Sequence, residues 1–548
     1  SAARSNYRRA LKEHQNSDVS YYSNQLHDAL LAKRPREFWQ TWNSKFNTQR
    51  KFEQINGLSN KQEIVDNFQK HFQAVTSLVN SPEEARLKDE FDINWSSYHG
   101  DPLLESHLFD VELVDSIIFN LSRNKAPGLD GLTTEHLLFC HPSIFTILCK
   151  LFNMMLEYSY VPAAFGLSYT VPLPKSPAHS NSRNVGFDDF RGIAISGILS
   201  KVFEKCILAR FNDYFLTSDH QFGFKSKSSC SQAIFAVRNY VEYIINNGGT
   251  ANICAIDITK AFDKLNHYCI FTKLMKRRLP SPLVGCLFSW FSGSFTCIKW
   301  FGYFSMFYKL EQGVRQGSVL SPIIFAICID VIVGQHVFPS YFKLFLFADD
   351  VLIVSGAVSR LQAALLQLET DLKSLDMRIN EKKCVCVRVG RHCNSPCSIL
   401  ALTDGRNLPW SQELRYLGIF IKAGQYFRCN YSSCKLKFIR SANCLFAKLA
   451  HHASEEVMLS LMVSKCLPAL LYGLEACPVL SSDVQSLDFV VSRFIFKLFR
   501  TSTRSVVDEI ISKFNIPMPS SLLPVRTRRF LETVKLSDNY LCYCHIQS

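Results

Sequence analysis

Two apolar runs flank a pair of adjacent acids in the segment Lys343-Leu-Phe-Leu-Phe347-Ala348-Asp349-Asp350-Val351-Leu-Ile-Val-Ser355. Both runs are rich in the aromatic and β-branched residues that favour strands. The pattern predicts a β-hairpin that presents the carboxylates of Asp349 and Asp350 at its tip.

A similar apolar run ends on an acid in Ala251-Asn-Ile-Cys-Ala-Ile-Asp257, and Ile258-Thr-Lys-Ala-Phe-Asp263 follows it. We expect a strand that ends at Asp257 and a helix that begins just after it. The strand would hold this carboxylate rigidly beside a turn. Asp263 comes six positions after Asp257, and ideal helical rotation points it elsewhere, so we expect it to be structural.

Adjacent aspartates between apolar strands are unfavourable unless something compensates their charge. Like charges at this distance raise one another's pKa, and a divalent cation is the usual remedy. Mg²⁺ prefers carboxylate oxygens together with phosphates and waters, and two such ions about 3.5–4 Å apart support phosphoryl transfer. A solvent-exposed turn is the alternative, because aspartate is a common turn residue.

The composition is that of a folded protein with a basic surface. The chain has 548 residues, of which 47% are hydrophobic and 20% charged, which excludes wholesale disorder. With 61 Lys and Arg against 47 Asp and Glu, the formal charge of +14 favours a polyanionic partner. The 20 cysteines are scattered singly, which favours buried thiols in a reducing compartment.

Three regions differ in pattern. Residues 1–102 are expected to form a helical N-terminal extension, with residues 81–102 as an acidic linker. Residues 103–430 alternate strands and helices, with a loop marked by Pro172, Pro174 and Pro177. Residues 431–548 are expected to be mainly helical. The most apolar region, 279–308, is interrupted by prolines, glycines and Lys299, so no membrane span is expected.

A series of motifs now extends the pattern beyond the acids. Before the Asp257 segment come Lys125-Ala-Pro-Gly-Leu-Asp-Gly131, Val171-Pro-Leu-Pro-Lys175, Phe190-Arg191-Gly-Ile-Ala194 and Gln221-Phe-Gly-Phe224. After it come Gly313-Val-Arg-Gln316-Gly317-Ser-Val-Leu-Ser-Pro322, the hairpin, Ile379-Asn380-Glu-Lys382-Lys383 and Leu414-Arg-Tyr416-Leu417-Gly418, then Lys465-Cys-Leu-Pro468 and Leu471-Tyr-Gly473. In kind and order these motifs resemble those of reverse transcriptases of non-LTR (LINE-type) retrotransposons, over at least residues 105–500.

The resemblance implies an α+β fold of the right-hand polymerase type. Its fingers and antiparallel palm would occupy residues 103–430 and its helical thumb residues 431–548, after the N-terminal extension. The implied activity is RNA-directed DNA polymerase, extending a DNA primer on an RNA template with deoxynucleoside triphosphates. Two Mg²⁺ ions are the implied cofactor, with Mn²⁺ as a substitute. The implied location is the nucleus, after a cytoplasmic ribonucleoprotein stage.

The resemblance also assigns site residues. The implied catalytic residues, which are also metal ligands together with the carbonyl of Ile258, are Asp257, Asp349 and Asp350. The implied nucleotide-binding residues are Lys175, Arg191, Phe262, Gln316, Gly317 and Lys382. Among these, Phe262 would exclude a 2′-hydroxyl, or it packs in the core. Either Lys382 or its neighbour Lys383 would protonate the pyrophosphate that leaves.

Two alternatives remain open on the sequence. A viral RNA-dependent RNA polymerase also presents paired aspartates, although Phe262 and Ala348 argue against it. A catalytically inactive retroelement remnant would bind RNA without extending a primer. The chain begins at Ser1 rather than Met, so we expect it to be a piece of a longer protein, and the endonuclease that many relatives carry upstream is not seen in it.

Overall fold

The computed structural model describes residues 54–78, 81–175, 185–334, 342–449 and 453–543, with single positions between 25 and 42. Most of residues 1–53, including much of the predicted N-terminal helical region, therefore lies outside the described residues. The chain divides into two compact units. One comprises residues 52–233 and 244–411, and the other comprises residues 1–51, 234–243 and 412–548.

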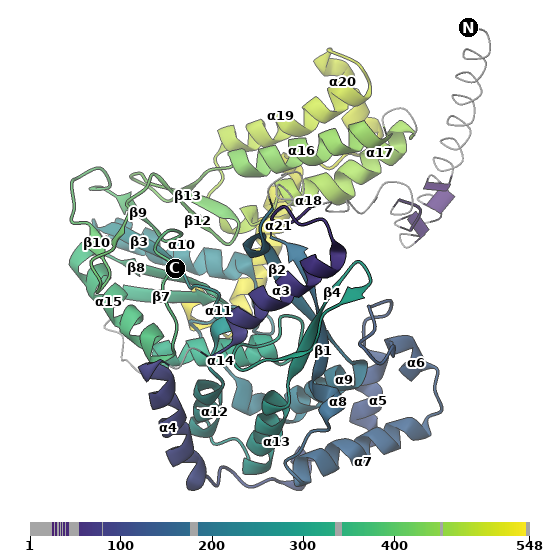
Figure 1. Ribbon diagram of the computed structural model, residues 1–548. Helices are drawn as coiled ribbons and strands as arrows, with labels where there is room; N and C mark the ends of the chain where they lie inside the picture. The colour runs from purple at the N-terminus through teal and green to yellow at the C-terminus, as the bar shows by residue number, and fades with distance from the viewer. Residues whose placement is uncertain are drawn as a thin grey trace. The chain divides into compact units, whose positions relative to one another are not determined.

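The first unit contains a four-stranded antiparallel sheet (Figure 1). Its order is β7 (Phe342–Phe347), β8 (Asp350–Ser355), β3 (Thr250–Asp257), β9 (Val385–Gly390). Nearly every residue of β3 is buried, because this strand has a neighbour on each edge and α15 (Val358–Ser374) packs against it and against β7 and β8. The predicted hairpin and the strand that ends at Asp257 are both confirmed.

A second sheet joins strands from distant parts of the sequence. β1 (Leu167–Pro174) lies between β2 (Phe190–Ser196) and β4 (Phe295–Trp300), and β4 also pairs with β5 (Tyr303–Phe304) and β6 (Tyr308–Lys309). The predicted loop is wrong at Pro172 and Pro174, because both prolines lie in β1, and Pro177 lies outside the described residues. β4 pairs only with residues 167–170 of β1, so the edge of β1 that faces β4 has no partner strand at the two prolines. Proline, which has no backbone N–H to donate, is tolerated at such an edge.

Helices enclose both sheets. They are α3 (Lys61–Thr76), α4 (Pro82–Ser96), α5 (Val111–Phe119), α6 (Thr134–Leu138), α7 (Ser143–Glu157), α8 (Ala163–Gly166), α9 (Ile198–Arg210), α11 (Ala261–Lys264), α12 (His267–Lys276), α13 (Ser281–Ser292) and α14 (Ser321–Gly334). A short hairpin of β10 (Leu400–Ala401) and β11 (Asn407–Leu408) completes the unit. One continuous apolar core joins these helices, except α3, to the four-stranded sheet. Helix α3 instead packs in a separate apolar cluster with residues of β2, β4 and β6.

The acidic segment predicted as a linker is instead a helix, α4, packed beside α12 (Figure 1). Ser81 is its N-cap, and its hydroxyl accepts a hydrogen bond from the Glu84 backbone N–H at 3.1 Å. Pro82 occupies the first turn, and Glu83 and Glu84 complement the positive end of the helix dipole. The acids that suggested a linker are therefore a helix start.

The second unit is mainly helical, as predicted for residues 431–548. It contains α16 (Ser432–Leu449), α17 (Glu455–Leu461), a π-helical turn (Met462–Cys466), α18 (Leu467–Leu470), α19 (Ser481–Leu498), α20 (Arg504–Lys513) and α21 (Pro519–Lys535). A three-stranded sheet of β12 (Glu413–Tyr416), β13 (Ile419–Lys422) and β14 (Arg428–Cys429) belongs to the same unit. The middle of α10 (Cys230–Asn246) also belongs to this unit, and its Phe235 contacts Phe530 of α21.

The fold is thus a mixed α+β fold. Within the described ranges, no helix combines the length and apolar character that a membrane crossing requires. The cysteines that the structure describes are free thiols, and most of them are buried.

Candidate active site

The predicted acids lie at one end of the four-stranded sheet. Asp257, the last residue of β3, pairs with Asp350, the first residue of β8, and Asp349 lies in the two-residue turn before it. Asp257 and Asp349 both line a cavity of about 530 Å³, whereas Asp350 is exposed and does not line it. Two carboxylates from separate segments thus lie on the same cavity.

Most of the residues predicted from the resemblance line this cavity: Lys175, Arg191, Asp257, Ile258, Phe262, Gln316, Gly317 and Asp349. Asp350 and Lys382 do not. The predicted residues that line the cavity therefore come from positions between 175 and 349 of the sequence.

The backbone of Ile258 presents its carbonyl on the side of the hairpin. The Asp257 carbonyl accepts a hydrogen bond from Asn380 N–H at 2.8 Å, and Thr259 N–H donates to the Arg378 carbonyl at 2.9 Å. Because alternate residues of an extended chain bond to opposite sides, the polar groups of Ile258 point away from residues 378–380.

The tip of the hairpin is held by the segment 221–224. Gln221 is fully buried, and its side-chain oxygen accepts hydrogen bonds from Gly223 N–H at 2.8 Å and Ala348 N–H at 3.1 Å. Ala348 has a left-handed backbone with φ of 56°. A Cβ on Gly223 would lie 2.3 Å from the Ala348 nitrogen, so only glycine allows this approach. The sequence offered these residues only as a family motif.

Lys383, rather than Lys382, lies beside the acids. Lys383 Nζ lies 3.5 Å from Asp257 Oδ2, and Asn380 Nδ2 donates to the same oxygen at 3.0 Å. The turn at 380–383 therefore supplies two groups that face the carboxylate of Asp257.

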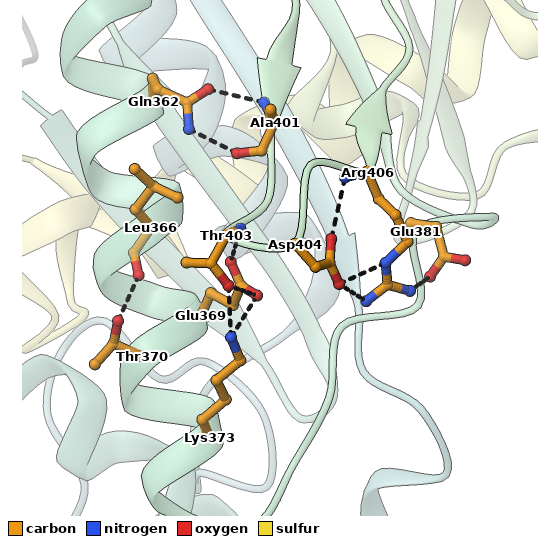
Figure 2. A network of polar contacts seen from close by, with 10 residues as sticks. All are labelled: Gln362, Leu366, Glu369, Thr370, Lys373, Glu381, Ala401, Thr403, Asp404 and Arg406. Atoms are coloured by element: carbon orange, nitrogen blue, oxygen red, sulfur yellow. Dashed lines mark hydrogen bonds and ion pairs between the residues drawn. The ribbon is translucent and has the colours of Figure 1, made fainter.

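A polar network joins this turn to the β10–β11 hairpin and to α15, as Figure 2 shows. Arg406 forms ion pairs with Glu381 of the turn and with Asp404 of the β10–β11 hairpin. The hairpin is in turn joined to α15, where Glu369 accepts hydrogen bonds from the Thr403 N–H and hydroxyl, both at 2.7 Å.

The same network contains a further ion pair, between Lys373 and Glu369, and a side-chain amide that is hydrogen-bonded to the backbone. Lys373 Nζ lies 2.9 Å from Glu369 Oε1 and donates to Thr403 Oγ1 at 2.6 Å. Gln362 exchanges two hydrogen bonds with the backbone of Ala401, at 2.7 and 2.9 Å (Figure 2). Burial by itself would raise the pKa of Glu369, but the hydrogen bonds from Thr403 and Lys373 outweigh it and lower that pKa.

Cationic side chains gather on another wall of the cavity. Arg191 pairs with Leu173 across β1 and β2, and Lys175 follows the end of β1. Lys175 Nζ donates to the Asp188 carbonyl at 2.6 Å, and Lys260 Nζ lies 3.4 Å from the Asp188 carboxylate. Burial, and next the charge of Lys260, lower the pKa of Lys175.

Helix α3 supplies site residues that the sequence analysis did not predict. His71, Phe72 and Val75 of this helix line the cavity. His71 Nε2 lies 3.7 Å from Asp188 Oδ1, and burial lowers the pKa of the imidazole. The spacing of these residues marks one face of a helix, but nothing in the sequence indicates that this face meets residues 175–191.

The ring of Phe262 is fixed from two sides. It stacks on Phe325 with ring centres 4.2 Å apart and planes 17° apart, and its edge meets Phe224 at 6.1 Å. Phe262 is half-buried, so it both packs against the core and lines the cavity.

The loop at 313–317 is held between two segments. Ala194 N–H donates to the Gln316 carbonyl at 2.8 Å, and Gln316 Nε2 donates to Asp263 Oδ1 at 2.8 Å. Burial raises the pKa of Asp263. Gly317 has φ of 131°, and a Cβ there would lie 2.3 Å from the Ala194 carbonyl oxygen. Asp263 thus positions Gln316 while also lining the cavity.

A buried carboxylate orders the continuation of this loop. Glu204 of α9 accepts hydrogen bonds from Ser318 Oγ at 2.8 Å and from the Val319 and Leu320 backbone N–H groups, just before α14. Arg315 donates to the Gly166 carbonyl and to Ser294 Oγ, both at 2.6 Å. Burial raises the pKa of Glu204 and lowers that of Arg315 to about 10.

Among the residues that the structure describes, no three histidine, cysteine, aspartate or glutamate side chains are grouped so that they could hold a metal ion. The acids of the cavity thus form no complete protein cage for a cation.

Most of this cavity lies in a part of the chain that matches a known protein family. Residues 174–421 match the family described as "Reverse transcriptase (RNA-dependent DNA polymerase)", a range that includes most of the cavity and the whole four-stranded sheet. This chain contains a reverse transcriptase domain. Helix α3 lies outside the matched range, so the cavity extends beyond the reverse transcriptase domain as the family defines it.

The relatives of this domain are proteins of non-LTR retrotransposons. The Pol polyprotein of the type-2 retrotransposable element R2DM of Drosophila melanogaster is 25% identical over 57% of this chain and 30% of its own length. The RNA-directed DNA polymerase from the mobile element jockey of the same species is 23% identical over 79% of this chain and 48% of its own. The chain spans about a third to a half of these relatives.

Among solved structures, apo telomerase from Candida tropicalis aligns with a TM-score of 0.37 at 13% identity, covering 73% of this chain and 74% of that one. A similarity of this size supports no conclusion about the chain.

Proposed function

We propose that the chain is an RNA-directed DNA polymerase of a non-LTR retrotransposon that extends a DNA primer on an RNA template by two-metal nucleotidyl transfer. The observation that carries this proposal is the single cavity that holds Asp257, Asp349, Lys175, Arg191 and Phe262. Carboxylates at one wall and cations at another suit a substrate that carries both metal ions and a triphosphate. The reverse transcriptase domain and the retrotransposon relatives support the same activity.

The proposal includes a right-hand polymerase fold. The four-stranded sheet with Asp257 and the hairpin would be the palm, and β1 and β2 with Lys175 and Arg191 would belong to the fingers. The helices after residue 430 would be the thumb. The division at residues 102 and 430 stays a prediction.

The donors of the cavity fit Mg²⁺. This ion is usually held by one or two carboxylates together with waters and substrate phosphates rather than by a complete protein cage. Asp257 and Asp349 provide two carboxylates on one cavity, and the Ile258 carbonyl points to the hairpin side. Asp350 would act from outside the cavity. When bound, the metal ions would activate the primer hydroxyl and stabilise the departing oxygen, and Mn²⁺ could substitute.

The remaining residues would position the nucleotide. Lys175 and Arg191 would bind its phosphates, Lys as a compact charge and Arg as a bidentate fork. The ring of Phe262 would lie under the sugar, where a 2′-hydroxyl would meet it. Gln316 and Gly317 would lie against the new base pair. Positioning and electrostatic stabilisation supply most of the rate in such phosphoryl transfers.

Lys383 is the better candidate for the general acid. The primer 3′-hydroxyl attacks the α-phosphate, and pyrophosphate leaves with a negative charge that a proton can neutralise. Lys383 lines the cavity and faces Asp257, whereas Lys382 does not line it. Its Nζ would give the proton to the leaving pyrophosphate.

The partners follow from the reaction. They are an RNA template, a DNA primer or target, and deoxynucleoside triphosphates, with backbone contacts that neutralise phosphates. The excess positive charge of the chain suits such partners. We place the reaction in the nucleus, after a cytoplasmic ribonucleoprotein stage.

Primer extension on an RNA template with Mg²⁺ tests this function directly. We expect extension with deoxynucleotides that Asp349→Asn abolishes. Asp115→Asn removes the same charge from an exposed position on α5 and should leave extension unchanged. Each protein is assayed with deoxynucleotides and with ribonucleotides in parallel.

The other outcomes identify the alternatives. Extension with ribonucleotides alone would indicate an RNA polymerase. Salt-sensitive binding of template without any extension would indicate an inactive remnant that binds RNA, and the proposed activity would be withdrawn.

A further inference from the structure

The cationic wall of the cavity carries more groups able to bind an anion than the two basic residues predicted for it. Lys175 and Arg191 were predicted to bind the nucleotide. Lys260, in the segment after Asp257, and His71, on α3, were not, and both face Asp188. Lys260 stands in the left-handed conformation, with φ of 46°. Such a conformation is unfavourable for a side chain larger than glycine and is often found at functional sites.

Asp188 is the anion that these groups share. Its Oδ1 lies 3.4 Å from Lys260 Nζ and 3.7 Å from His71 Nε2, and its backbone carbonyl accepts a hydrogen bond from Lys175 Nζ. One carboxylate thus faces one ammonium group and one imidazole, while its own backbone carbonyl binds a second ammonium group.

The backbone at Asp188 is fixed although its side chain is exposed. The neighbouring Asp189 carbonyl accepts a hydrogen bond from Lys175 N–H at 2.8 Å, and Phe187 packs against Phe68 of α3 with ring centres 4.8 Å apart. The Asp188 side chain, in contrast, is 80% exposed. Exposed ion pairs are weak, so a more highly charged anion can displace this carboxylate without moving the turn.

We propose that Asp188 is a built-in counter-anion of the triphosphate site: it holds Lys260 and His71 until a polyphosphate displaces it. Lys260 and His71 are then phosphate-binding residues in addition to Lys175 and Arg191. The inference rests on the proposed function for its natural ligand, a nucleoside triphosphate. Its site lies partly on α3, outside the matched family range.

Competition between Asp188 and the polyphosphate should affect both nucleotide binding and pyrophosphate release. Asp188 weakens the binding of every polyphosphate by competing for the same cations. It lowers the affinity for the incoming nucleotide, and it also assists release of pyrophosphate, because the carboxylate returns to Lys260 and His71 as the product leaves.

Binding of inorganic tripolyphosphate, measured by calorimetry on the full chain without divalent metal, tests the inference. We expect Asp188→Asn to tighten the dissociation constant by roughly three- to tenfold, the fold-change of one or two exposed ion pairs. Asp115→Asn, which changes the net charge equally, should leave binding unchanged. In the double variant Asp188→Asn with Lys260→Met, the gain should be lost.

The same variant is then tested in primer extension. We expect Asp188→Asn to lower the KM for deoxynucleotides and the inhibition constant of pyrophosphate by similar factors. Equal tripolyphosphate affinity of Asp188→Asn and Asp115→Asn would overturn the inference, even if the chain extends primers. Tighter binding by Asp188→Asn in a chain that extends no primer would uphold the anion site and remove the proposed polymerase.

Discussion

Lys383 Nζ lies 3.5 Å from Asp257 Oδ2, and the neighbouring Lys382 does not line the cavity. The two lysines differ by one position in a turn, and that position decides which ammonium group faces the acids. The sequence left the choice between them open. The turn that presents Lys383 is anchored by Arg406 through Glu381.

Substituting Lys383 by methionine should lower kcat for primer extension by about a hundredfold, the range that general acid catalysis contributes. Lys382→Met is the matched control, and it should retain most of the activity. Steady-state kinetics of both variants provides the measurement. Equal losses in the two variants would mean that neither lysine is the general acid and that both act only through surface charge.

Glu369 gives the first unit a specific pH dependence. Its pKa is lowered below the usual 4.5 in the folded chain, because the hydrogen bonds from Thr403 and Lys373 outweigh the effect of burial. A lowered pKa stabilises the fold fully above the unfolded value, and this stability is lost as the pH falls through the folded value. We therefore expect the contribution of Glu369 to decline as the pH falls below about 4.5 and to be lost at pH values below its folded pKa.

Glu369→Gln should lower the free energy of unfolding by about 1–3 kcal/mol at pH 7. The reason is that Thr403 and Lys373 would lose the buried negative charge to which they bind. Thermal unfolding of wild type and variant should converge as the pH falls below 4.5. Glu157→Gln, at an exposed position on α7, is the control and should differ little from wild type at either pH. A difference that stays constant with pH would contradict the assignment.

Gly317 should not tolerate a side chain. A Cβ at this position would lie 2.3 Å from the Ala194 carbonyl oxygen, and the backbone has φ of 131°. We expect Gly317→Ala to move Gln316, to lower activity by more than tenfold and to lower stability by about 1–3 kcal/mol.

Gly302→Ala is the matched control for this change. Gly302 also has a positive φ, of 90°, but no atom lies within 4 Å of the position of its Cβ. This variant therefore measures the backbone cost alone, and its primer extension should be nearly normal. Comparable loss of activity in both variants would show that contact with Ala194 is not the cause.

The parts of the fold that local patterns determine were predictable from the sequence. The hairpin around Asp349 and the strand that ends at Asp257 follow from short apolar runs that end at acidic residues, and both are present. Local patterns gave wrong predictions where the same residue type is common in two kinds of structure. The acids after Ser81 suggested a linker, but they are the first turn of α4, and Pro172 and Pro174 fit a strand whose edge is unpaired there.

The parts of the site that depend on distant contacts were not predictable. His71 reaches the cavity because α3 packs beside β4, and no pattern within residues 61–76 indicates that partner. Lys260 stood in a quoted segment, but its role depends on Asp188, which is 72 residues away in the sequence. The resemblance assigned roles only to residues within the family motifs. It therefore could not identify site residues on α3, which lies outside those motifs.

Phe262 should control the choice between deoxynucleotides and ribonucleotides. Its ring is half-buried, stacked on Phe325 at 4.2 Å and met by Phe224, so it cannot move aside for a 2′-hydroxyl without breaking both contacts. Phe262→Ala removes the ring and should raise kcat/KM for ribonucleotides relative to deoxynucleotides by at least about tenfold, or 1.4 kcal/mol of discrimination. Phe262→Tyr keeps the ring and should keep the discrimination. If Phe262→Ala still rejects ribonucleotides while Phe262→Tyr is normal, the ring serves the core alone and another group must read the sugar.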